Sequence, residues 1–218
     1  VNAETGRINI EGNPRLKTLL INRSRIVKNA SGKLTLALKI LREQFKEGQK
    51  WIIYCDNIDQ LNAVCSRARD DGFDAYEYYA EMEGDRDTTL EYFFQNGGVL
   101  VSIKCLDEGV DIPSTTHALV LASSQNSREF IQRRGRILRK ADGKLFAHLY
   151  DAITVPVIVE ADDTERGLSI ISAELARAIE FGKGAENPAC VTDLKNIALD
   201  YQIEYDTIKD GGIEDDEE

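Results

Sequence analysis

The sequence lacks the features that would assign it to a membrane, a secretory route or a metal-binding class. No apolar run approaches the roughly 20 residues that a membrane-spanning helix needs. Residues 1–4 have neither the basic nor the apolar region of a signal peptide. The four cysteines form no CxxC pair, so neither a zinc site nor a redox pair is indicated. We therefore expect a cytoplasmic protein with reduced thiols, no metal site and no membrane partner.

Phosphate-binding signatures are also missing. The P-loop pattern GxxxxGK[ST] does not occur, and neither does a DExH or DExD box that would hold Mg²⁺ and position water. The glycine-rich turn of a Rossmann-type dinucleotide site is absent after the first expected strand, where Asp56-Asn57 stands instead. The chain alone is therefore predicted not to hydrolyse ATP, and an unrelated Rossmann-type enzyme is disfavoured.

Positive charge is scarce overall, since the net charge is −11, but the two signs are unevenly distributed. Residues 151–218 contain 18 acidic and 5 basic side chains, a net charge of −13, whereas residues 1–150 have a net charge of +2. The acidity therefore belongs to the C-terminal part, and the total charge does not exclude nucleic-acid binding by the rest of the chain.

Short apolar runs alternate with helical patterns about every 20–30 residues, which is typical of a parallel sheet with helices on both faces. Strands are expected over residues 51–55, 73–79, 99–102, 118–122 and 145–150. Helices are expected from Asn13 to Ser31-Gly32, from there to Gly48, and over residues 58–71, 85–95, 127–140, 168–181 and 191–209, before a disordered tail over 210–218. We expect a helical lead-in over residues 1–48, an α/β core over 49–152, and a helical, acidic extension over 153–218. His117 and His148 stand alone at strand positions, where packing is their expected role.

Three polar stretches follow expected strands, at the carboxyl ends where open α/β sheets bind ligands. They are residues 55–57, the stretch 103–113 after Ser102, and the stretch 123–128 after Ala122. Small polar side chains and backbone amides are suited to phosphate groups. The alternative is that these are ordinary polar loops that cap the following helices.

The residues from Gln132 to Arg139 read QRRGRILR. On a helix, Gln132, Arg136 and Arg139 share one face, while an apolar stripe packs elsewhere. Four arginines within seven residues repel one another, and a polyphosphate would supply the missing anion with a geometry that guanidinium groups match. Gly135 would let a backbone or a ligand approach closely. The alternative is a solvated basic face paired with the acidic tail.

Four of these segments together resemble the second RecA-like lobe of superfamily 2 helicases. QRRGRILR is similar to the motif VI pattern QRxGRxxR, and Glu108–Pro113 (EGVDIP) is similar to motif V. Trp51–Asn57 resembles motif IV, and the RxxxLxxF helix between motifs IV and V is matched from Arg86 onward. The resemblance covers about residues 50–150 in the family's order and spacing, and it implies a RecA-like fold for the α/β core.

The resemblance also implies roles for individual residues. Arg136 and Arg139 correspond to arginine fingers that stabilise charge on the γ-phosphate of ATP, with Gln132 beside them. Gly109 and Asp111 of motif V would meet the nucleotide and couple its state to nucleic acid. Sequence-independent contacts with the nucleic-acid backbone would come from the three polar stretches, namely from Cys55, Asp56, Asn57, Ser102, Lys104 and Arg128.

Motif VI also indicates a branch of the superfamily. It begins with Gln132 and has Ile137-Leu138 before its last arginine, which resembles restriction-enzyme and excision-repair DNA translocases more than DEAD-box RNA helicases. Arg23 and Lys33 resemble the lead-in to the second lobe in those proteins. The resemblance implies that ATP and Mg²⁺ are held mainly by an N-terminal P-loop lobe of the same parent chain, with DNA favoured over RNA. The alternative is a non-enzymatic RecA-like module that binds nucleic acid or protein, against which the arginine pair argues.

Overall fold

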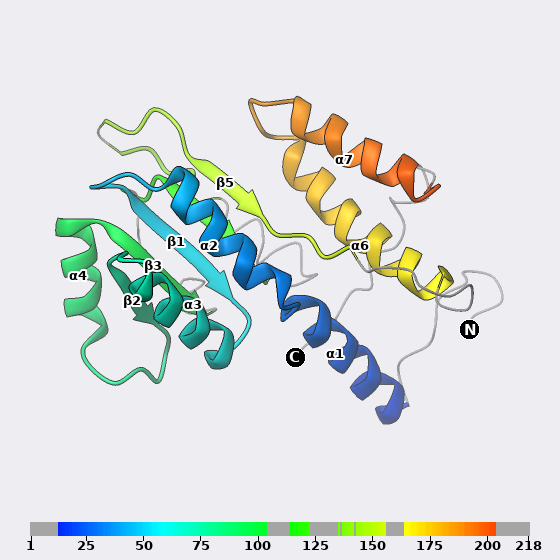
Figure 1. The fold of residues 1–218 in the computed structure, drawn as a ribbon, viewed down its shortest axis with the longest axis horizontal. Coiled ribbons are helices and arrows are strands. Elements are labelled where there is room, and N and C mark those ends of the chain that lie inside the picture. Colours follow the sequence, from blue (N-terminus) through cyan, green and yellow to red (C-terminus); the bar gives the residue numbers. More distant parts are fainter. Residues whose placement is uncertain are drawn as a thin grey trace.

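The computed structural model describes residues 13–103, 114–122, 135, 137–141, 143–155 and 164–203. Within these residues, five strands form one sheet in the order β2-β3-β1-β4-β5 (Figure 1). All four pairings between neighbouring strands are parallel. The strands are β1 (Lys50–Cys55), β2 (Ala75–Tyr78), β3 (Gly98–Ile103), β4 (His117–Val120) and β5 (His148–Asp151). The predicted parallel α/β architecture is therefore confirmed.

Helices lie on both faces of this sheet, as predicted. Those of the lobe are α1 (Pro14–Lys28), α2 (Gly32–Gln44), α3 (Ile58–Asp70) and α4 (Arg86–Asn96). Two further helices, α6 (Thr164–Gly182) and α7 (Ala189–Asp200), pack against each other as a hairpin beside β5 (Figure 1). None of the helices in the described part of the chain is long and apolar enough to cross a membrane.

The central position of β1 follows from its sequence. Trp51, Ile52, Ile53, Tyr54 and Cys55 are all buried, because both faces and both edges of this strand are covered. A continuous apolar run is the pattern of a parallel strand buried on both faces. Alternate side chains of β1 consequently enter two different cores.

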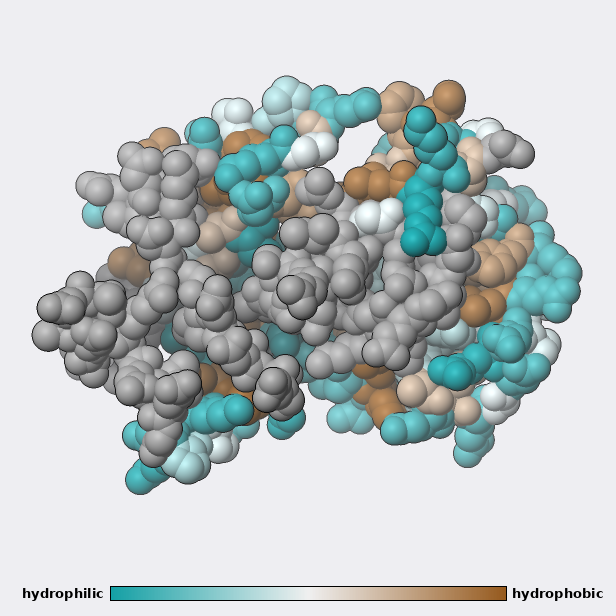
Figure 2. Space-filling model, turned by 180° about the vertical axis from the view of Figure 1, so that it is seen from behind, coloured by the Kyte–Doolittle hydropathy of each residue, from teal (hydrophilic) through white to brown (hydrophobic). Residues whose placement is uncertain are grey.

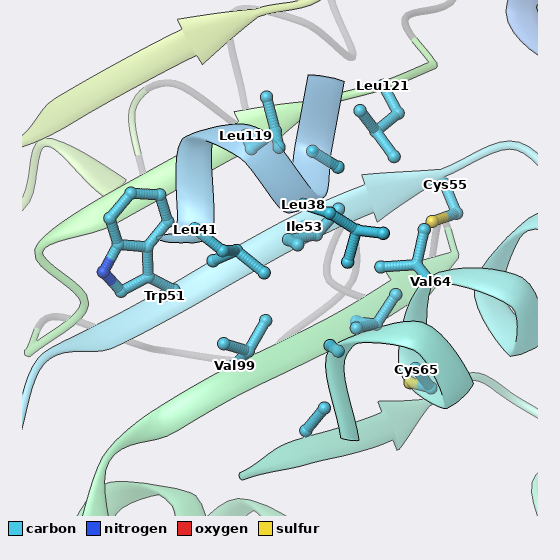
Figure 3. Close-up of a cluster of buried hydrophobic side chains, with 14 of the residues drawn as sticks. Leu38, Leu41, Trp51, Ile53, Cys55, Val64, Cys65, Val99, Leu119 and Leu121 are labelled. Atoms are coloured by element: carbon cyan, nitrogen blue, oxygen red, sulfur yellow. The ribbon is translucent and has the colours of Figure 1, made fainter. Parts of the chain in front are cut away.

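The first core lies between the sheet and helices α2 and α3. Leu38 and Leu41 of α2 and Val64 of α3 belong to the same buried cluster as Trp51, Ile53 and Cys55 of β1 (Figure 3). The second core lies on the opposite face, where α4 packs against the strands. Its buried members are Ile52, Tyr54, Tyr78, Leu90, Phe93, Leu100, Ala118, Val120 and Ile137.

Helix starts follow the predicted capping residues. The side chain of Asn13 accepts a hydrogen bond from the backbone N–H of Leu16 at 3.1 Å, and that of Asp85 accepts one from Asp87 at 3.0 Å. Such caps satisfy N–H groups that have no partner within the helix. Asn57 caps α3 in the same way, which agrees with the alternative reading of its loop as a helix cap.

Two element ends differ from the sequence-based expectation. The last strand begins at His148 rather than at Leu145, and the side chains of Leu145 and Phe146 are exposed. Helix α7 ends at Asp200 rather than near residue 209, because Gln202 adopts a left-handed conformation with φ of 55°. The backbone N–H of Ile203 then donates to the carbonyl of Ala198 at 2.9 Å, which is a Schellman end built without the usual glycine.

The α6–α7 hairpin has a small core of its own. Its buried members are Ile171, Leu175, Ile179, Ala198 and Ile203, with Ile153 packed against them. Exposed large apolar side chains are spread over several elements and loops of the described chain: Leu19, Ile26, Leu36, Ile58, Tyr92, Leu138, Leu145, Phe146, Val155 and Leu199. On the face shown in Figure 2, hydrophilic and apolar residues accordingly alternate over the described surface.

Candidate nucleotide and nucleic-acid interface

The parallel sheet brings the ends of several strands to one edge, called the carboxyl edge here. β1 ends there with Cys55, β3 with Ile103, β4 with Val120 and β5 with Asp151. This edge is where open α/β sheets bind their ligands. The predicted residues Asp56, Asn57 and Ser102 therefore lie at the expected edge, although they come from two separate strands.

Asp56 and Asn57 are bound into a polar junction between α1 and the turn that follows β1. Asn57 accepts a hydrogen bond from the N–H of Gln60 at 2.9 Å and donates one to the side-chain oxygen of Asn29 at 3.0 Å. Asn29 donates in turn to Asp56 at 3.0 Å, and Lys28 Nζ lies 3.6 Å from the same carboxylate. The N–H of Asp56 also donates to Gln60 Oε1 at 2.8 Å, so these contacts fix the turn that leads into α3.

Cys55 and Ser102 lie deeper than a direct contact with nucleic acid requires. The Cys55 side chain is buried in the first core (Figure 3), and burial raises the pKa of its thiol well above the usual range. Ser102 is fully buried, and its hydroxyl has no hydrogen-bond partner among the described residues. Side-chain contacts from these two positions are therefore not supported, and a contact there would have to use the main chain.

The arginine motif lies partly outside the described residues. Of its candidate ligands, Arg139 is described, and its side chain is exposed. Its backbone carbonyl accepts a hydrogen bond from Lys144 Nζ at 3.1 Å, and the same ammonium contacts the carbonyl of Ile137. The predicted ligands that fall outside the described part are Lys104, Gly109, Asp111, Arg128, Gln132 and Arg136.

The apolar side of the motif differs in one detail from the prediction. Ile137 is buried in the second core, which anchors this segment to the sheet, whereas Leu138 is 47% exposed. A Cβ added at Gly135 would meet no atom within 4 Å. No close approach by the described chain therefore requires glycine at this position, and a close approach by a ligand stays a prediction.

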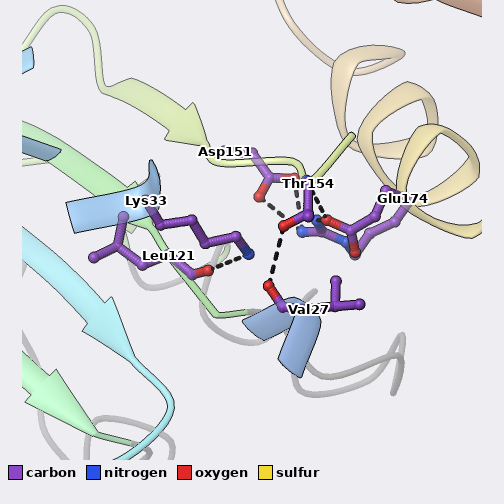
Figure 4. A network of polar contacts seen from close by, with 7 residues as sticks. Val27, Lys33, Leu121, Asp151, Thr154 and Glu174 are labelled. Atoms are coloured by element: carbon purple, nitrogen blue, oxygen red, sulfur yellow. Dashed lines mark hydrogen bonds and ion pairs between the residues drawn. The ribbon is translucent and has the colours of Figure 1, made fainter. Parts of the chain in front are cut away.

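A buried group of four charged residues lies at the carboxyl edge beyond β4 and β5 (Figure 4). We call Lys33, Asp151, Glu174 and Arg177 the buried charge cluster. Arg177 Nη1 lies 2.7 and 2.8 Å from the two oxygens of Asp151, and its Nη2 lies 3.0 Å from Glu174. Lys33 Nζ donates to the backbone carbonyl of Leu121 at 2.7 Å. Two positive and two negative groups thus balance within a small buried volume.

Electrostatics in the cluster are dominated by the loss of water. Burial lowers the pKa of Lys33, while the nearby carboxylates, first among them Glu174, oppose this decrease. Burial raises the pKa of Asp151, and the guanidinium of Arg177 limits that increase. A buried charge is costly unless it is paired, so each member of the cluster depends on the others.

Sequence analysis did not single out Asp151, Glu174 or Arg177. One signal was present, because Lys33 shares a helical face with the apolar residues Ala37 and Leu41 of α2. A charged residue on an apolar face indicates a buried partner, but its identity depends on the tertiary fold.

Residues 32–141, half of the chain, match the family described as the helicase conserved C-terminal domain. Together with the parallel sheet, this match defines the chain as a second RecA-like lobe of the superfamily 2 helicases. The chain belongs to this helicase C-terminal domain family. In accord with this, the fold resembles the C-terminal domain of the DEAD-box protein Dbp5, with a TM-score of 0.50 and 17% identity over 72% of this chain and 83% of that one.

Two curated relatives share shorter regions with the chain. It is 28% identical over 135 residues to a putative ATP-dependent RNA helicase of Methanocaldococcus jannaschii, which is 58% of this chain and 17% of that protein. It is 50% identical over 66 residues to the DNA 3′–5′ translocase XPB2 of Sulfurisphaera tokodaii, which is 29% of this chain and 15% of that protein. The chain thus spans less than a fifth of either relative, and the XPB2 match agrees with the translocase branch.

Proposed function

We propose that this chain is the second motor lobe of an ATP-dependent superfamily 2 DNA translocase or helicase. In this proposal, an N-terminal P-loop lobe of the same parent chain holds ATP and Mg²⁺. The present chain closes over the nucleotide and supplies positive charge to its phosphates. The observation that carries the proposal is the family match over residues 32–141, which includes the whole arginine motif.

Arg139 is assigned the role of an arginine finger together with Arg136. Its guanidinium is exposed, while Ile137 anchors the same segment in the second core. This combination suits a finger, because the backbone is fixed and the side chain lies at the surface. A finger of this kind stabilises charge on the transferred phosphoryl group. Gln132, Gly109 and Asp111 are assigned to the nucleotide on the strength of the motif resemblance.

The carboxyl edge is assigned to the nucleic-acid backbone. Asn57 would contribute its backbone amide, because the side chains of Asp56 and Asn57 are used within the junction and the N–H of Asp56 donates to Gln60 Oε1 at 2.8 Å. Lys104 and Arg128 would contribute charge, and the contacts would be independent of base sequence. Among the described residues, no group of three His, Cys, Asp or Glu side chains is placed to hold a metal ion. We therefore assign no Mg²⁺ ligand to this chain.

The test is the ATPase activity of the full-length parent protein with no polymer, with DNA and with RNA. We expect Arg136→Ala and Arg139→Ala each to lower the stimulated kcat by about 10³-fold or more while the proteins stay folded. Arg42→Ala is the matched control, because Arg42 forms an exposed, bidentate pair with Asp71 on the outer side of α2 and α3. It should leave kcat unchanged.

Each alternative outcome has a defined meaning. Stimulation by RNA but not by DNA would overturn the DNA assignment and leave the motor assignment in place. Turnover that is indifferent to both motif arginines would refute the finger role. A parent protein that binds nucleic acid but never hydrolyses ATP would support a non-enzymatic RecA-like module. The isolated lobe is expected to be inactive, because the residues that bind ATP are on the other side of the interface.

A further inference from the structure

We propose that the buried charge cluster is a positioning device, by which the α6–α7 hairpin holds the end of β4 and so the chain that leads from β4 to the arginine motif. Its members come from three parts of the fold: Lys33 from α2, Asp151 from the end of β5, and Glu174 and Arg177 from α6. The role in catalysis rests on the proposed function. The physical coupling between α6 and β4 does not.

The first link is between α6 and the end of β5. Arg177 is only 13% exposed and contacts both oxygens of Asp151, so this pair is shielded from water and from salt. Glu174 accepts hydrogen bonds from Arg177 and from the backbone N–H of Thr154, both at 3.0 Å. The hydroxyl of Thr154 donates to the carbonyl of Val27 in α1 at 3.0 Å. Helix α6 is therefore tied both to the sheet and to α1.

The second link is between α2 and the end of β4. Lys33 is 5% exposed, and its ammonium donates to the carbonyl of Leu121 directly after β4 (Figure 4). A charged ammonium makes this hydrogen bond stronger, yet burial and then the guanidinium of Arg177 lower the pKa of Lys33 and disfavour that charge. Glu174 and Asp151 are the carboxylates that most favour it. The end of β4 is also joined directly to β5, because Val120 pairs with Asp151 and the N–H of Ala152 donates to the carbonyl of Val120 at 2.9 Å. Helix α6 therefore reaches the end of β4 through Asp151.

The two links join because the cluster is balanced in charge. Without Arg177, the carboxylates of Asp151 and Glu174 would lose their cation and draw the Lys33 ammonium away from Leu121. Without Lys33, the carbonyl of Leu121 would lose this hydrogen bond. In either case the end of β4 loses one of its restraints, while the backbone hydrogen bonds from Leu121 and Ala122 to the carbonyl of Tyr54 remain. Arg177 itself makes no hydrogen bond to β4 among the described residues. The chain beyond Ala122 continues to the arginine motif. A looser strand end would misplace the fingers without removing them.

Hydrogen exchange of the chain as it stands tests the coupling. Arg177→Met should speed exchange of the amides over residues 117–125 by about threefold to thirtyfold. The exchange rates of the amides in α3 and α4 should change less, because the substitution is expected to loosen the end of β4 without lowering the stability of the whole lobe. Arg42→Met, which breaks an exposed pair on the outer side of α2 and α3, is the matched control and should leave residues 117–125 unchanged.

A charge rescue makes the test independent of whether any one variant is well folded. Lys33→Met leaves the cluster with one excess negative charge, and adding Glu174→Gln restores neutrality. The double variant should therefore exchange more slowly over residues 117–125 than Lys33→Met alone. Glu174→Gln alone is a milder probe than Arg177→Met if the latter fails to fold. Faster exchange confined to α6 and α7, or additive effects of the two substitutions, would overturn the coupling.

The catalytic part of the proposal is tested in the parent protein. Arg177→Met should lower kcat about threefold to thirtyfold and leave the KM for ATP unchanged, because the first lobe binds the nucleotide. A higher KM with unchanged kcat would refute a positioning role. If Arg139→Ala leaves turnover intact, the finger assignment fails, and the exchange experiment alone then decides whether α6 is coupled to β4.

Discussion

Acidification should destabilise this lobe through one buried histidine, His117. This residue is 6% exposed at the start of β4. Its ring is stacked between Trp51 at 4.4 Å and His148 at 4.6 Å, with interplanar angles of 8° and 13°. Burial, together with the charges of His148 and Lys46, lowers the pKa of His117 to about 4. His117 is therefore neutral in the folded lobe across the range in which an unfolded chain would protonate it.

The sign and size of the effect follow from linkage. The folded pKa of about 4 lies below the unfolded value of 6.5, so the unfolded state takes up a proton first as the pH falls. Protonation of His117 therefore has no effect on the free energy of unfolding above about pH 7. Below that, it lowers this free energy progressively until about pH 4. The loss amounts to about 2 kcal/mol between pH 7 and pH 5, and to roughly 3 kcal/mol in all.

Urea unfolding at pH 7, 6 and 5 measures this loss. His117→Phe keeps a flat ring between Trp51 and His148 but cannot titrate. Between pH 7 and pH 5, the free energy of unfolding of the wild type should fall by about 2 kcal/mol more than that of this variant. His148→Gln removes a neighbouring charge and should reduce the acid loss. Parallel curves for wild type and His117→Phe would refute the argument.

Two further predictions concern the core and the junction. Leu41→Ala should lower the unfolding free energy by about 2–5 kcal/mol in urea, because Leu41 is fully buried. Leu199→Ala, at a leucine that is 71% exposed, should change it by no more than about 0.5 kcal/mol. Asn57→Ala should cost about 0.5–2 kcal/mol in thermal unfolding, since it removes the cap of α3 and the link to Asn29. Equal costs for the two leucine variants, or no cost at Asn57, would contradict the packing described.

The sequence predicts the elements of the fold well and their arrangement only in part. The apolar run from Trp51 to Cys55 indicates a strand buried on both faces, and that strand proves to be the centre of the sheet. The strand order cannot be inferred from such a run, because each crossover helix can place the next strand on either side of β1. The apolar pattern alone predicts the parallel α/β class. The RecA-like fold within that class was implied by the family resemblance.

The polar residues of the interface were predicted less well than the strands. Asp56 and Asn57 lie at the carboxyl edge as expected, but their side chains are used to join α1 to α3. A polar side chain in a loop has the same sequence signal whether it binds a ligand or caps a helix. The partners of Lys33 were not predicted for a related reason, since Glu174 and Arg177 belong to a segment in which no motif was recognised. The end of α7 was misjudged because Gln202 takes a conformation that usually indicates glycine or asparagine.

The position of β1 in the sheet has a consequence for how the chain folds during synthesis. β1 precedes the other four described strands in the chain, yet Lys50 pairs with Gly98 and Trp51 pairs with His117. An apolar strand with two unpaired edges must therefore remain exposed while the following helices and strands are translated. Pairings between segments far apart in sequence also form slowly, because their loops are costly to close. The complete five-stranded sheet is thus expected to form only after residue 151 has left the ribosome, and β1 to need protection from aggregation until its own partners have been made.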